Sequence, residues 1–432
     1  MSVQTYDAAV IGGGLAGLIA AIDLAKEGVS TVLLEKSSRM GGRAMTSNKN
    51  GVFLNLGAHA LYRTGKAFAI LQELGVRLEG GRPASQIGVL SHNRLLPMPT
   101  SPWGLLSSRL LSWSGKRQLI KLMTTLSKLE SDKLPDTSIK EWVEREIDDP
   151  LVQKLFYALC RTATYTVEPA HLLAGPALAQ IQRSLKGGVL YLHGGWQTIV
   201  DQLREKAADA GVHIISNKRV TDIQQEDGRI KKLYFADGEQ MDVTYVISTA
   251  SPAENEKLLQ GAEYTVLKRW KEAARPSMAA CLDLGLKKLS PKGPHFVLDL
   301  DRPIYFSNHS LHAELSANGT VVTHLLKYNG PHESDPKEDE RILAETMNLL
   351  HPGWEKEVVA RQFLPNITVS HDFPHIGRRE MAIGPEVPEV QGFYVAGDWA
   401  GHGEFLVDAS AASARRAVQA IMKKCRLTAA IH

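Results

Sequence analysis

The hydrophobic pattern at the start of the chain predicts a strand, a tight turn, a helix and a second strand. Residues 7–11 are largely apolar, glycines recur over residues 12–17, and residues 18–26 follow a helical period. A second apolar run, residues 30–34, ends at Glu35. Apolar runs bounded by turn residues are typical of buried parallel strands, so we expect a βαβ unit here.

Two later blocks carry related signals. Strand-like runs occur at residues 212–215, 230–235 and 245–248. Asp227-Gly228 and Asp237-Gly238 flank the middle run, and Asp-Gly pairs favour tight hairpin turns. Toward the C-terminus, an apolar run at 392–396 ends at Gly397, and residues 406–422 have an alanine-rich helical pattern. Strand followed by helix therefore appears again at the far end.

The segments between these blocks differ in character. Residues 83–192 are mostly helical in pattern, whereas residues 252–389 are mixed, with strand-like runs at 295–300 and 320–327. We therefore predict an α/β protein in which a discontinuous Rossmann-like domain carries an inserted, mixed α+β substrate domain. The predicted Rossmann-like domain comprises residues 1–80, 190–250 and 390–432, and the substrate domain comprises residues 81–189 and 251–389.

Composition narrows the possible classes of protein. A chain of 432 residues with 44% hydrophobic and 22% charged residues is typical of a folded protein with more than one domain. Its net charge of +3 gives no global field that would favour a nucleic-acid partner. Cys160, Cys281 and Cys425 form no CxxC pair, so neither a disulfide framework nor a thiolate metal site is expected.

Targeting signals are also missing from the pattern. No window reaches the roughly 18–20 apolar residues that a spanning helix needs. The first residues, 1–7, contain no charged region followed by an apolar stretch and a cleavage site. We therefore expect a cytoplasmic protein.

The glycines of the first turn carry the clearest chemical signal. Gly12, Gly14 and Gly17 have the GxGxxG spacing, which suits a tight turn, close approach of a pyrophosphate, and close packing of helix on strand. Leu15 and Ala16 open the helix, and the positive end of a helix dipole favours phosphate groups. We predict that these five residues bind a dinucleotide.

Glu35, at the end of the second strand, supports this interpretation. A carboxylate at this position accepts hydrogen bonds from the ribose hydroxyls and repels a 2′-phosphate. NADP is therefore disfavoured, and NAD and FAD remain as candidates. Lys36 follows Glu35 directly, and we predict that it also belongs to the dinucleotide-binding site.

The next residues resemble a known family. After Glu35 come Arg39-Met40-Gly41-Gly42-Arg43 and then Gly51-Val52-Phe53-Leu54-Asn55-Leu56-Gly57-Ala58-His59. This arrangement resembles the superfamily of flavin-containing amine oxidases, phytoene desaturases and protoporphyrinogen oxidases. The resemblance implies FAD as the cofactor, with Gly42 and Arg43 against the pyrophosphate and Gly57, Ala58 and His59 beside the flavin ring. Arginine suits a diphosphate because its guanidinium is planar and always charged.

The resemblance extends to the far end of the chain. Gly397 and Asp398 match the family's late glycine-aspartate pair, and Val407 begins the segment that contacts the cofactor there. Asp408 stands where the family usually has glutamate, and the family's helix-opening glycines are absent, so the helix contacts are the weaker part of the match. Val220 matches a valine whose backbone lines the adenine site.

The substrate chemistry is less defined by the sequence. Amine oxidases of the superfamily carry a lysine near flavin N5, yet residues 277–284, where it is expected, contain none, and Leu406 replaces an expected aromatic residue. The resemblance then favours a desaturase-like or protoporphyrinogen-oxidase-like enzyme that passes hydride to flavin N5 from CH–CH or CH–NH bonds of a lipophilic substrate. Two alternatives stay open: a flavin amine oxidase that produces hydrogen peroxide, and a redox-neutral isomerase or non-catalytic FAD-binding protein.

No catalytic residue is assigned, although four residues invite a role. Lys327 could approach the pocket or be a solvated charge at a strand edge, and Trp399 could line the flavin or serve packing alone. His371 and His375 do not predict a metal site, because Pro374 between them prevents the helix that would align their side chains.

A basic, amphipathic segment suggests contact with a membrane surface. Residues 80–129 contain no acidic side chain, while Arg109, Lys116, Arg117 and Lys121 interleave with apolar residues between positions 103 and 126. Such a segment within 100–130 suits an anionic lipid surface, and packing on the protein's own core is the alternative. The expected partners are thus a lipophilic small molecule and, through residues 103–126, a membrane surface; the oligomeric state is not predicted.

Overall fold

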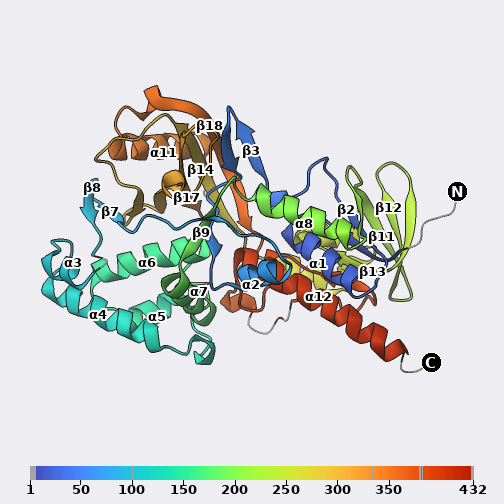
Figure 1. Ribbon diagram of the computed structural model, residues 1–432. Coiled ribbons are helices and arrows are strands. Elements are labelled where there is room, and N and C mark those ends of the chain that lie inside the picture. The colour runs from blue at the N-terminus through green and yellow to red at the C-terminus, as the bar shows by residue number, and fades with distance from the viewer. Residues whose placement is uncertain (1–5, 100, 332–333, 379–380, 382, 430–432) are drawn as a thin grey trace.

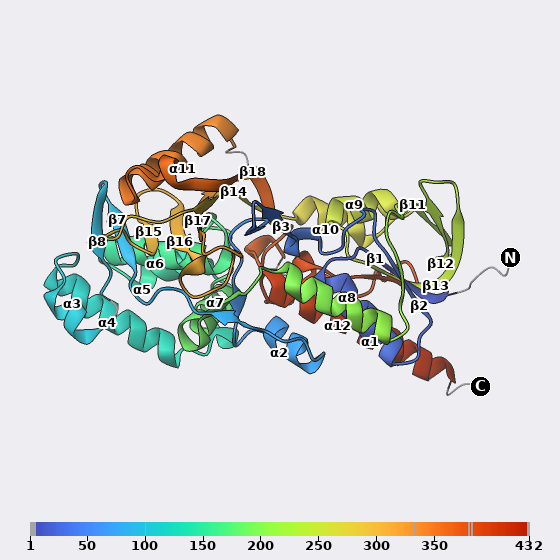
Figure 2. The same cartoon turned by 45° about the horizontal axis from the view of Figure 1, so that its top comes forward.

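The computed structural model describes residues 6–99, 101–331, 334–378, 381 and 383–429, and Figures 1 and 2 show two bodies side by side. The first is built on a seven-stranded sheet of order β10-β2-β1-β13-β12-β11, with β19 also paired to β13. Its strands are β1 (Tyr6–Ile11), β2 (Thr31–Leu34), β10 (His213–Ile215), β11 (Val220–Glu226), β12 (Arg229–Phe235), β13 (Gln240–Ser248) and β19 (Phe393–Val395). The strands β10, β2, β1, β13 and β19 are parallel to one another, whereas β12 pairs antiparallel with both β13 and β11.

Helices cover both faces of this sheet. The helices on one face are α1 (Leu15–Lys26), α2 (Lys66–Glu73), α8 (Gln197–Asp209) and α12 (Leu406–Ala429), which share a core with Ala8 and Val10. The opposite face packs on α9 (Pro252–Leu258) and α10 (Val266–Ala273) through Leu267 and Trp270. The sequence-based boundary at residue 250 therefore separates these two helices from the body on which they pack.

The two Asp-Gly turns lie where the pattern predicts them. Asp227 and Gly228 join β11 to β12 with φ of 52° and 70°, and Gly238, with φ of 85°, lies between β12 and β13. Positive φ at these positions is what a tight hairpin requires, and glycine adopts it without steric cost. The α/β, Rossmann-like prediction is confirmed.

The second body contains a seven-stranded, mostly antiparallel sheet of order β18-β14-β17-β16-β15-β7-β8. Its strands are β7 (Gly88–Ser91), β8 (Arg94–Pro97), β14 (Ser277–Leu286), β15 (Phe296–Asp299), β16 (Ile304–Asn308), β17 (Val321–Asn329) and β18 (Val358–Ser370). The expected helical character of residues 83–192 is thus wrong for β7 and β8, which extend the sheet through the parallel pairing of β7 with β15. Short strands between polar loops left too weak a periodic signal to separate from the helices that follow.

Helices enclose the second sheet as well. One face packs on α11 (Pro336–Leu350), and the other packs on a helical layer. That layer comprises α3 (Pro102–Ser107), α4 (Trp113–Lys128), α5 (Ile139–Glu146), α6 (Pro150–Thr164) and α7 (Ala174–Gly187). In both views α3 and α4 lie at the outer edge of the molecule, far from the two termini.

Small elements join the two bodies. Short strands form two further sheets: β3 (Thr46–Lys49) with β4 (Val52–Asn55), and β5 (Leu61–Tyr62), β9 (Val189–Leu192) and β6 (Gly80–Gly81). Short 3-10 helices include η1 (Gly42–Ala44), η2 (Ser131–Lys133), η3 (Ala262–Tyr264), η4 (His309–Leu311), η5 (Trp354–Glu357), η6 (Ile376–Arg378) and η7 (Asp398–Ala400). No helix among the described residues is long and apolar enough to cross a bilayer. Residues 1–5, most of the segment used for the localisation prediction, lie outside the described part.

Candidate functional site

The glycine-rich turn lies between the end of β1 and the start of α1. Gly12 has φ of 106°, and a Cβ there would lie 2.3 Å from Thr249 Oγ1; a Cβ on Gly17 would lie 1.9 Å from the Gly12 oxygen. Gly14 differs, because a Cβ there would meet no atom closer than 3.9 Å. Gly12 and Gly17 are therefore required by packing, whereas Gly14 faces open space.

The start of α1 is free of side-chain caps. Gly14 is the N-cap residue and offers no side-chain hydrogen bond, and Leu15 and Ala16 form the first turn. The backbone N–H groups of a first helical turn have no partner within the helix. Together with the space beside Gly14, they form a place where a phosphate group can bind, as the GxGxxG spacing predicts.

Glu35 lies at the end of β2, directly beside this turn. Gly13 N donates to Glu35 Oε2 at 2.7 Å, and the backbone N of Ser37 donates to Oε1 at 2.8 Å. Burial and these hydrogen bonds fix the carboxylate at the edge of the sheet where parallel strands end. Lys36 points elsewhere, since its ammonium pairs with Glu254 in an exposed ion pair.

The segment with the second glycine pair adjoins the first turn. Gly41 N donates to the Gly13 oxygen at 2.8 Å, and a Cβ on Gly42 would come within 3.8 Å of Gly14 Cα. Gly14 and Gly42 thus face each other across a gap with no side chain in it. Val220 lies apart from this gap, at the start of β11. Two residues before it, the backbone N of Lys218 donates to the backbone oxygen of Glu35.

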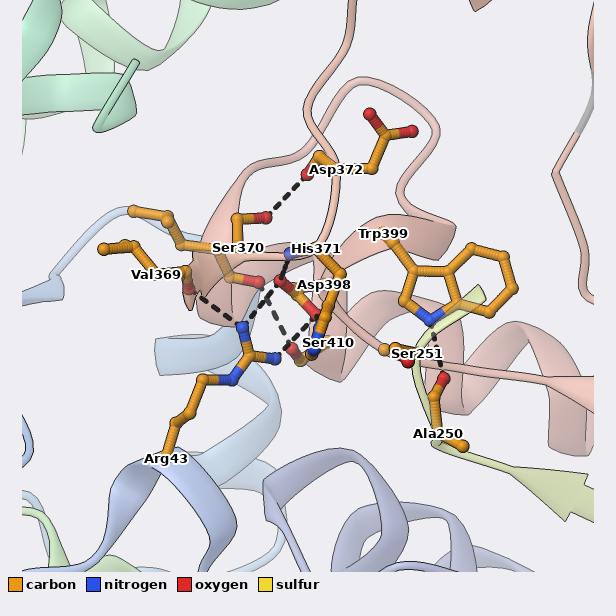
Figure 3. Close-up of polar contacts among 12 residues, drawn as sticks. Arg43, Ala250, Ser251, Val369, Ser370, His371, Asp372, Asp398, Trp399 and Ser410 are labelled. Atoms are coloured by element: carbon orange, nitrogen blue, oxygen red, sulfur yellow. Dashed lines mark hydrogen bonds and ion pairs between the residues drawn. The ribbon is translucent and has the colours of Figure 1, made fainter. Parts of the chain in front are cut away.

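Arg43 and Asp398 form a charged cluster that unites the two ends of the chain (Figure 3). Two Arg43 nitrogens donate to the two Asp398 carboxylate oxygens at 2.9 and 2.6 Å. The backbone N of His371 donates to Asp398 at 2.7 Å, and His371 Nδ1 lies 3.2 Å from the other oxygen. Burial alone would raise the pKa of Asp398, but Arg43 and His371 together hold it well below its usual range. The carboxylate is therefore ionised at neutral pH.

The cluster borders open space between the two bodies. A cavity of about 430 Å³ is lined by His371 and Ser251 from one side and by Met278 and Thr368 from the other. Trp399, next to Asp398, does not line this cavity. Its ring packs against Trp270, and its Nε1 donates to the Ala250 oxygen at 2.9 Å. Of the two roles considered for Trp399, its contacts fit packing.

Gly397 and the start of α12 are held by hydrogen bonds of their own. Ser413 Oγ accepts from Gly397 N at 2.9 Å, while Val407 packs on the core of the first body. Asp408 accepts a hydrogen bond from Ala67 N at 2.8 Å, at the start of α2. The carboxylate that replaces the family's glutamate thus caps another helix.

The segment Gly57-Ala58-His59 passes close to Arg43. His59 Nδ1 lies 2.9 Å from the Gly57 oxygen, its ring centroid is 5.1 Å from that of Trp196, and its side chain interacts with the Arg43 backbone. Burial lowers the pKa of His59, so the ring is neutral at pH 7. The structure therefore brings the predicted pyrophosphate and flavin segments next to each other.

A layer of tyrosines, which the sequence analysis missed, lies over this segment. Tyr165 donates from its hydroxyl to the Ala58 oxygen at 2.7 Å, and its ring centroid is 5.8 Å from that of Tyr328. Tyr305 packs 5.9 Å from Tyr328. Tyr165 has φ of 59°, a left-handed conformation that is uncommon for residues other than glycine and clusters at functional sites. No local pattern marks these residues, because they meet only through the fold.

A buried polar network lies on the same side of the second sheet. Asp283 on β14 pairs directly with His324 on β17, and His324 Nδ1 lies 2.6 Å from Asp283 Oδ1. Cys281 donates to Asp283 at 3.0 Å, and Gln362 Nε2 donates to it at 2.9 Å. Polar residues within otherwise apolar strands are the signal that could have found this network.

The side chains of Cys281, Asp283 and His324 are close enough to consider a metal ion. Their candidate ligand atoms lie within 4.8 Å of one another. Burial and the neighbouring Asp283 raise the pKa of the Cys281 thiol well above its usual value, so the sulfur stays protonated. Cys281 and His324 both contact the Asp283 carboxylate at hydrogen-bond distance, so the three side chains form a hydrogen-bond network.

Together, the fold and this site define a class: a dinucleotide-binding protein with a second, substrate-facing domain. Residues 15–281 match the family model described as flavin containing amine oxidoreductase. The chain belongs to this family. This is a family of flavin-dependent oxidoreductases.

Individual relatives agree with this assignment. Protoporphyrinogen oxidase 2 of Arabidopsis thaliana is 31% identical over 31% of this chain and 27% of its own length. The 4,4′-diapolycopene oxygenase of a Methylomonas species is 26% identical over 66% of this chain and 64% of its own length. An oxidoreductase from Methanosarcina mazei, of solved structure, matches 96% of this chain and 99% of its own with a TM-score of 0.79 and 22% identity, a likeness of fold. The chain thus spans less than two thirds of the length of these two curated relatives.

The residues of the site fit FAD. The gap between Gly14 and Gly42 would be partly filled by a Cβ on either, and the uncapped start of α1 faces it. In the predicted arrangement, Arg43 would supply a cation for the diphosphate, and Glu35 would supply an acceptor for ribose. The assignment of individual residues to parts of FAD stays a prediction.

Proposed function

We propose that the enzyme oxidises a lipophilic substrate by removing hydrogen from a CH–CH or CH–NH bond, in the manner of a desaturase or a protoporphyrinogen oxidase. Bound FAD would accept the hydride at N5. The chain's own residues would exclude water, hold the substrate and orient the reacting bond. The observation that carries the proposal is the set of aromatic and apolar side chains that share a buried cluster with Ala58 and would form the lining of a site beside it.

That lining comes from the inward face of the second sheet. Ala279, Leu326, Tyr305 and Tyr328 share one buried cluster with Ala58 and Phe405. A pocket with apolar and aromatic walls and few polar groups gains affinity from burial of apolar surface. This lining supports a lipophilic substrate.

The positions of the lysines argue against an amine oxidase. On β14 and β17 the inward-facing residues include Cys281, Asp283 and His324, and none of the inward positions on these strands is a lysine. Lys327 faces α11, where its Nζ lies 2.7 Å from Asp339. Of the two roles considered for Lys327, neither holds: it does not approach the pocket, and it is an ion-paired, largely buried residue instead of a solvated edge charge.

An anaerobic titration tests the proposal. The purified enzyme is expected to show oxidised flavin absorption that bleaches on addition of a porphyrinogen or a carotenoid precursor. Amines serve as the matched control, with hydrogen peroxide release as the readout. Bleaching by amines alone would replace the proposal with amine oxidation, and a flavin reduced by neither group would favour a redox-neutral role.

We also propose that α3 and α4 contact an anionic membrane surface from which such a substrate is drawn. Large apolar side chains are exposed along this edge: Leu95, Trp103, Leu106, Trp113, Ile120 and Met123. Arg109, Arg117 and Lys121 are exposed beside them. Lys116 does not contribute as the sequence pattern suggests, because it is buried and its Nζ donates to the Leu106 oxygen at 2.7 Å.

Two roles were considered for residues 103–126: packing on the protein's own core and contact with a membrane. The two faces of α4 fit one role each. Leu122 and Leu126 are buried against the helical layer, whereas Trp113, Ile120 and Met123 are exposed. An apolar strip with basic neighbours at the molecule's edge suits the boundary between lipid headgroups and acyl chains. This arrangement supports the proposed membrane contact.

Vesicle binding measures this contact. Replacing Trp103 and Trp113 with serine is expected to weaken partition into phosphatidylserine-containing vesicles about ten-fold or more, since each buried apolar side chain contributes on the order of 1 kcal/mol or more. Tyr264→Ser is the matched control, because Tyr264 on η3 is 84% exposed, as Trp103 is 82% exposed. Equal loss in both variants, or binding unaffected by phosphatidylserine, would contradict the proposal.

A further inference from the structure

A second cavity lies behind the tyrosine layer, on the side of α6. Its volume is about 250 Å³, and apolar residues such as Val167, Leu172, Leu300 and Pro303 line it. Tyr328 also lines it, so this residue separates the cavity from the layer that contacts Ala58. The cavity is large enough for one end of a substrate.

Arg161 lines this cavity and forms no ion pair among the described residues, although the charge of the nearby Asp299 carboxylate acts on it. Its Nε is buried and has no hydrogen-bond partner among the described residues, and its Nη2 donates only to the backbone oxygen of Asp299 at 3.2 Å. Neighbouring charges are already used: Arg302 binds the Asp299 carboxylate at 2.8 Å, and Lys154 binds Asp301 at 2.8 Å. Arg161 is half-buried, and an always-charged guanidinium that is partly withdrawn from water gains from pairing with an anion.

A second donor lies beside Arg161. The Tyr328 hydroxyl is buried, 2% of the residue being exposed, and its polar neighbour is the Thr162 hydroxyl, which itself donates to the Ala158 oxygen. Burial raises the pKa of Tyr328, so its hydroxyl stays protonated and can donate. One guanidinium and one hydroxyl in apolar surroundings can donate hydrogen bonds to a monoanion that has two acceptor oxygens. Asp301, which also lines the cavity, disfavours a dianion such as phosphate.

We propose that this cavity is a carboxylate-binding site, in which Arg161 and Tyr328 hold the acidic end of an otherwise apolar molecule. Its role in selecting the enzyme's substrate rests on the function proposed above. Arg161 and Tyr165 lie on the last turn of α6, where Tyr165 N donates to the Arg161 oxygen at 2.7 Å. The residue that binds the carboxylate and the residue that contacts Ala58 are therefore held in one rigid unit.

Calorimetric titration of the FAD-loaded enzyme tests the site without turnover. Octanoate is expected to bind about ten-fold or more tightly than octanamide, because a hydrogen bond to a charged group is worth more than a neutral one. Arg161→Gln is expected to remove this preference while leaving octanamide binding unchanged. Tyr328→Phe should weaken octanoate by a smaller factor, and Arg145→Gln, which removes an exposed cation on α5, should change nothing.

Thermal melting separates this role from a structural one. Loss of a half-buried cation that forms no ion pair among the described residues is not expected to lower the melting temperature, whereas loss of a structural contact would lower it. Equal affinity for octanoate and octanamide, or an octanoate preference that survives in Arg161→Gln, overturns the site.

The proposed function can fail separately. Arg161-dependent octanoate binding by an enzyme whose flavin no lipophilic compound reduces would leave the carboxylate site standing and overturn only that function. Flavin reduction by neutral lipophilic compounds, with no preference for a carboxylate, would support the proposed function and overturn only the carboxylate site.

Discussion

Replacing Asp398 with asparagine is expected to yield an enzyme that loses most of its FAD during purification and unfolds more readily. The carboxylate accepts two hydrogen bonds from Arg43 and one from His371 N. The Asp398 side chain is buried while that of Arg43 is 41% exposed, and loss of hydrogen bonds to such a charged group costs about 1–3 kcal/mol. Removal of the orienting charge beside Arg43 should also weaken FAD at least about ten-fold. Flavin content by absorbance and unfolding by denaturant measure the two effects.

The pH dependence of this loss follows from the pKa of Asp398. Its pKa in the folded protein is held well below that of the unfolded chain, so its stabilising contribution is present above about pH 4. The contribution is lost as the pH falls from there toward the folded pKa. The stability difference between the native enzyme and Asp398→Asn should therefore be constant near neutral pH and shrink below about pH 4.

Glu254→Gln serves as the control for Asp398→Asn. It also removes a carboxylate from an ion pair, with Lys36, but both partners are exposed. Exposed pairs contribute about 0–1 kcal/mol, so this variant should keep its FAD and its stability. Equal loss of FAD in both variants would show that the Arg43–Asp398 cluster has no special part in binding.

The first part of the fold was predictable because its signals are local. The glycine spacing, the apolar runs of β1 and β2 and the Asp227-Gly228 turn each act over a few residues. Local conformational rules therefore suffice to place the βαβ unit and Glu35 beside Gly13.

Other features depend on contacts between distant segments. Arg43 and Asp398 are 355 positions apart, and only the resemblance to a family indicated that both belong to one site. Asp283 and His324 meet through strand pairing, and no period in either strand reveals the register. Lys116 illustrates the limit for charge patterns, since a lysine counted as surface charge can bury its stem and bind a backbone oxygen.

Substituting alanine for Gly14 and for Gly17 is expected to separate FAD binding from folding. A Cβ on Gly14 meets no atom within 3.9 Å, and its φ of −78° suits any residue. The apoprotein of Gly14→Ala should therefore lose at most about 1 kcal/mol of stability, the usual cost of an altered N-cap. Its FAD affinity should fall at least about ten-fold, because the added methyl group occupies the gap that faces Gly42.

Gly17→Ala should behave in the opposite way. Its Cβ would lie 1.9 Å from the Gly12 oxygen, so α1 must move from β1, and the apoprotein should lose about 3 kcal/mol or more. Gly28→Ala provides the control for backbone strain alone, since Gly28 has φ of 81° but no atom near its Cβ position, and about 1–2 kcal/mol is expected. FAD titration and denaturant unfolding of all three apoproteins measure both quantities. Unchanged FAD affinity in Gly14→Ala would mean that the diphosphate does not lie in the gap between Gly14 and Gly42, even though the enzyme binds FAD.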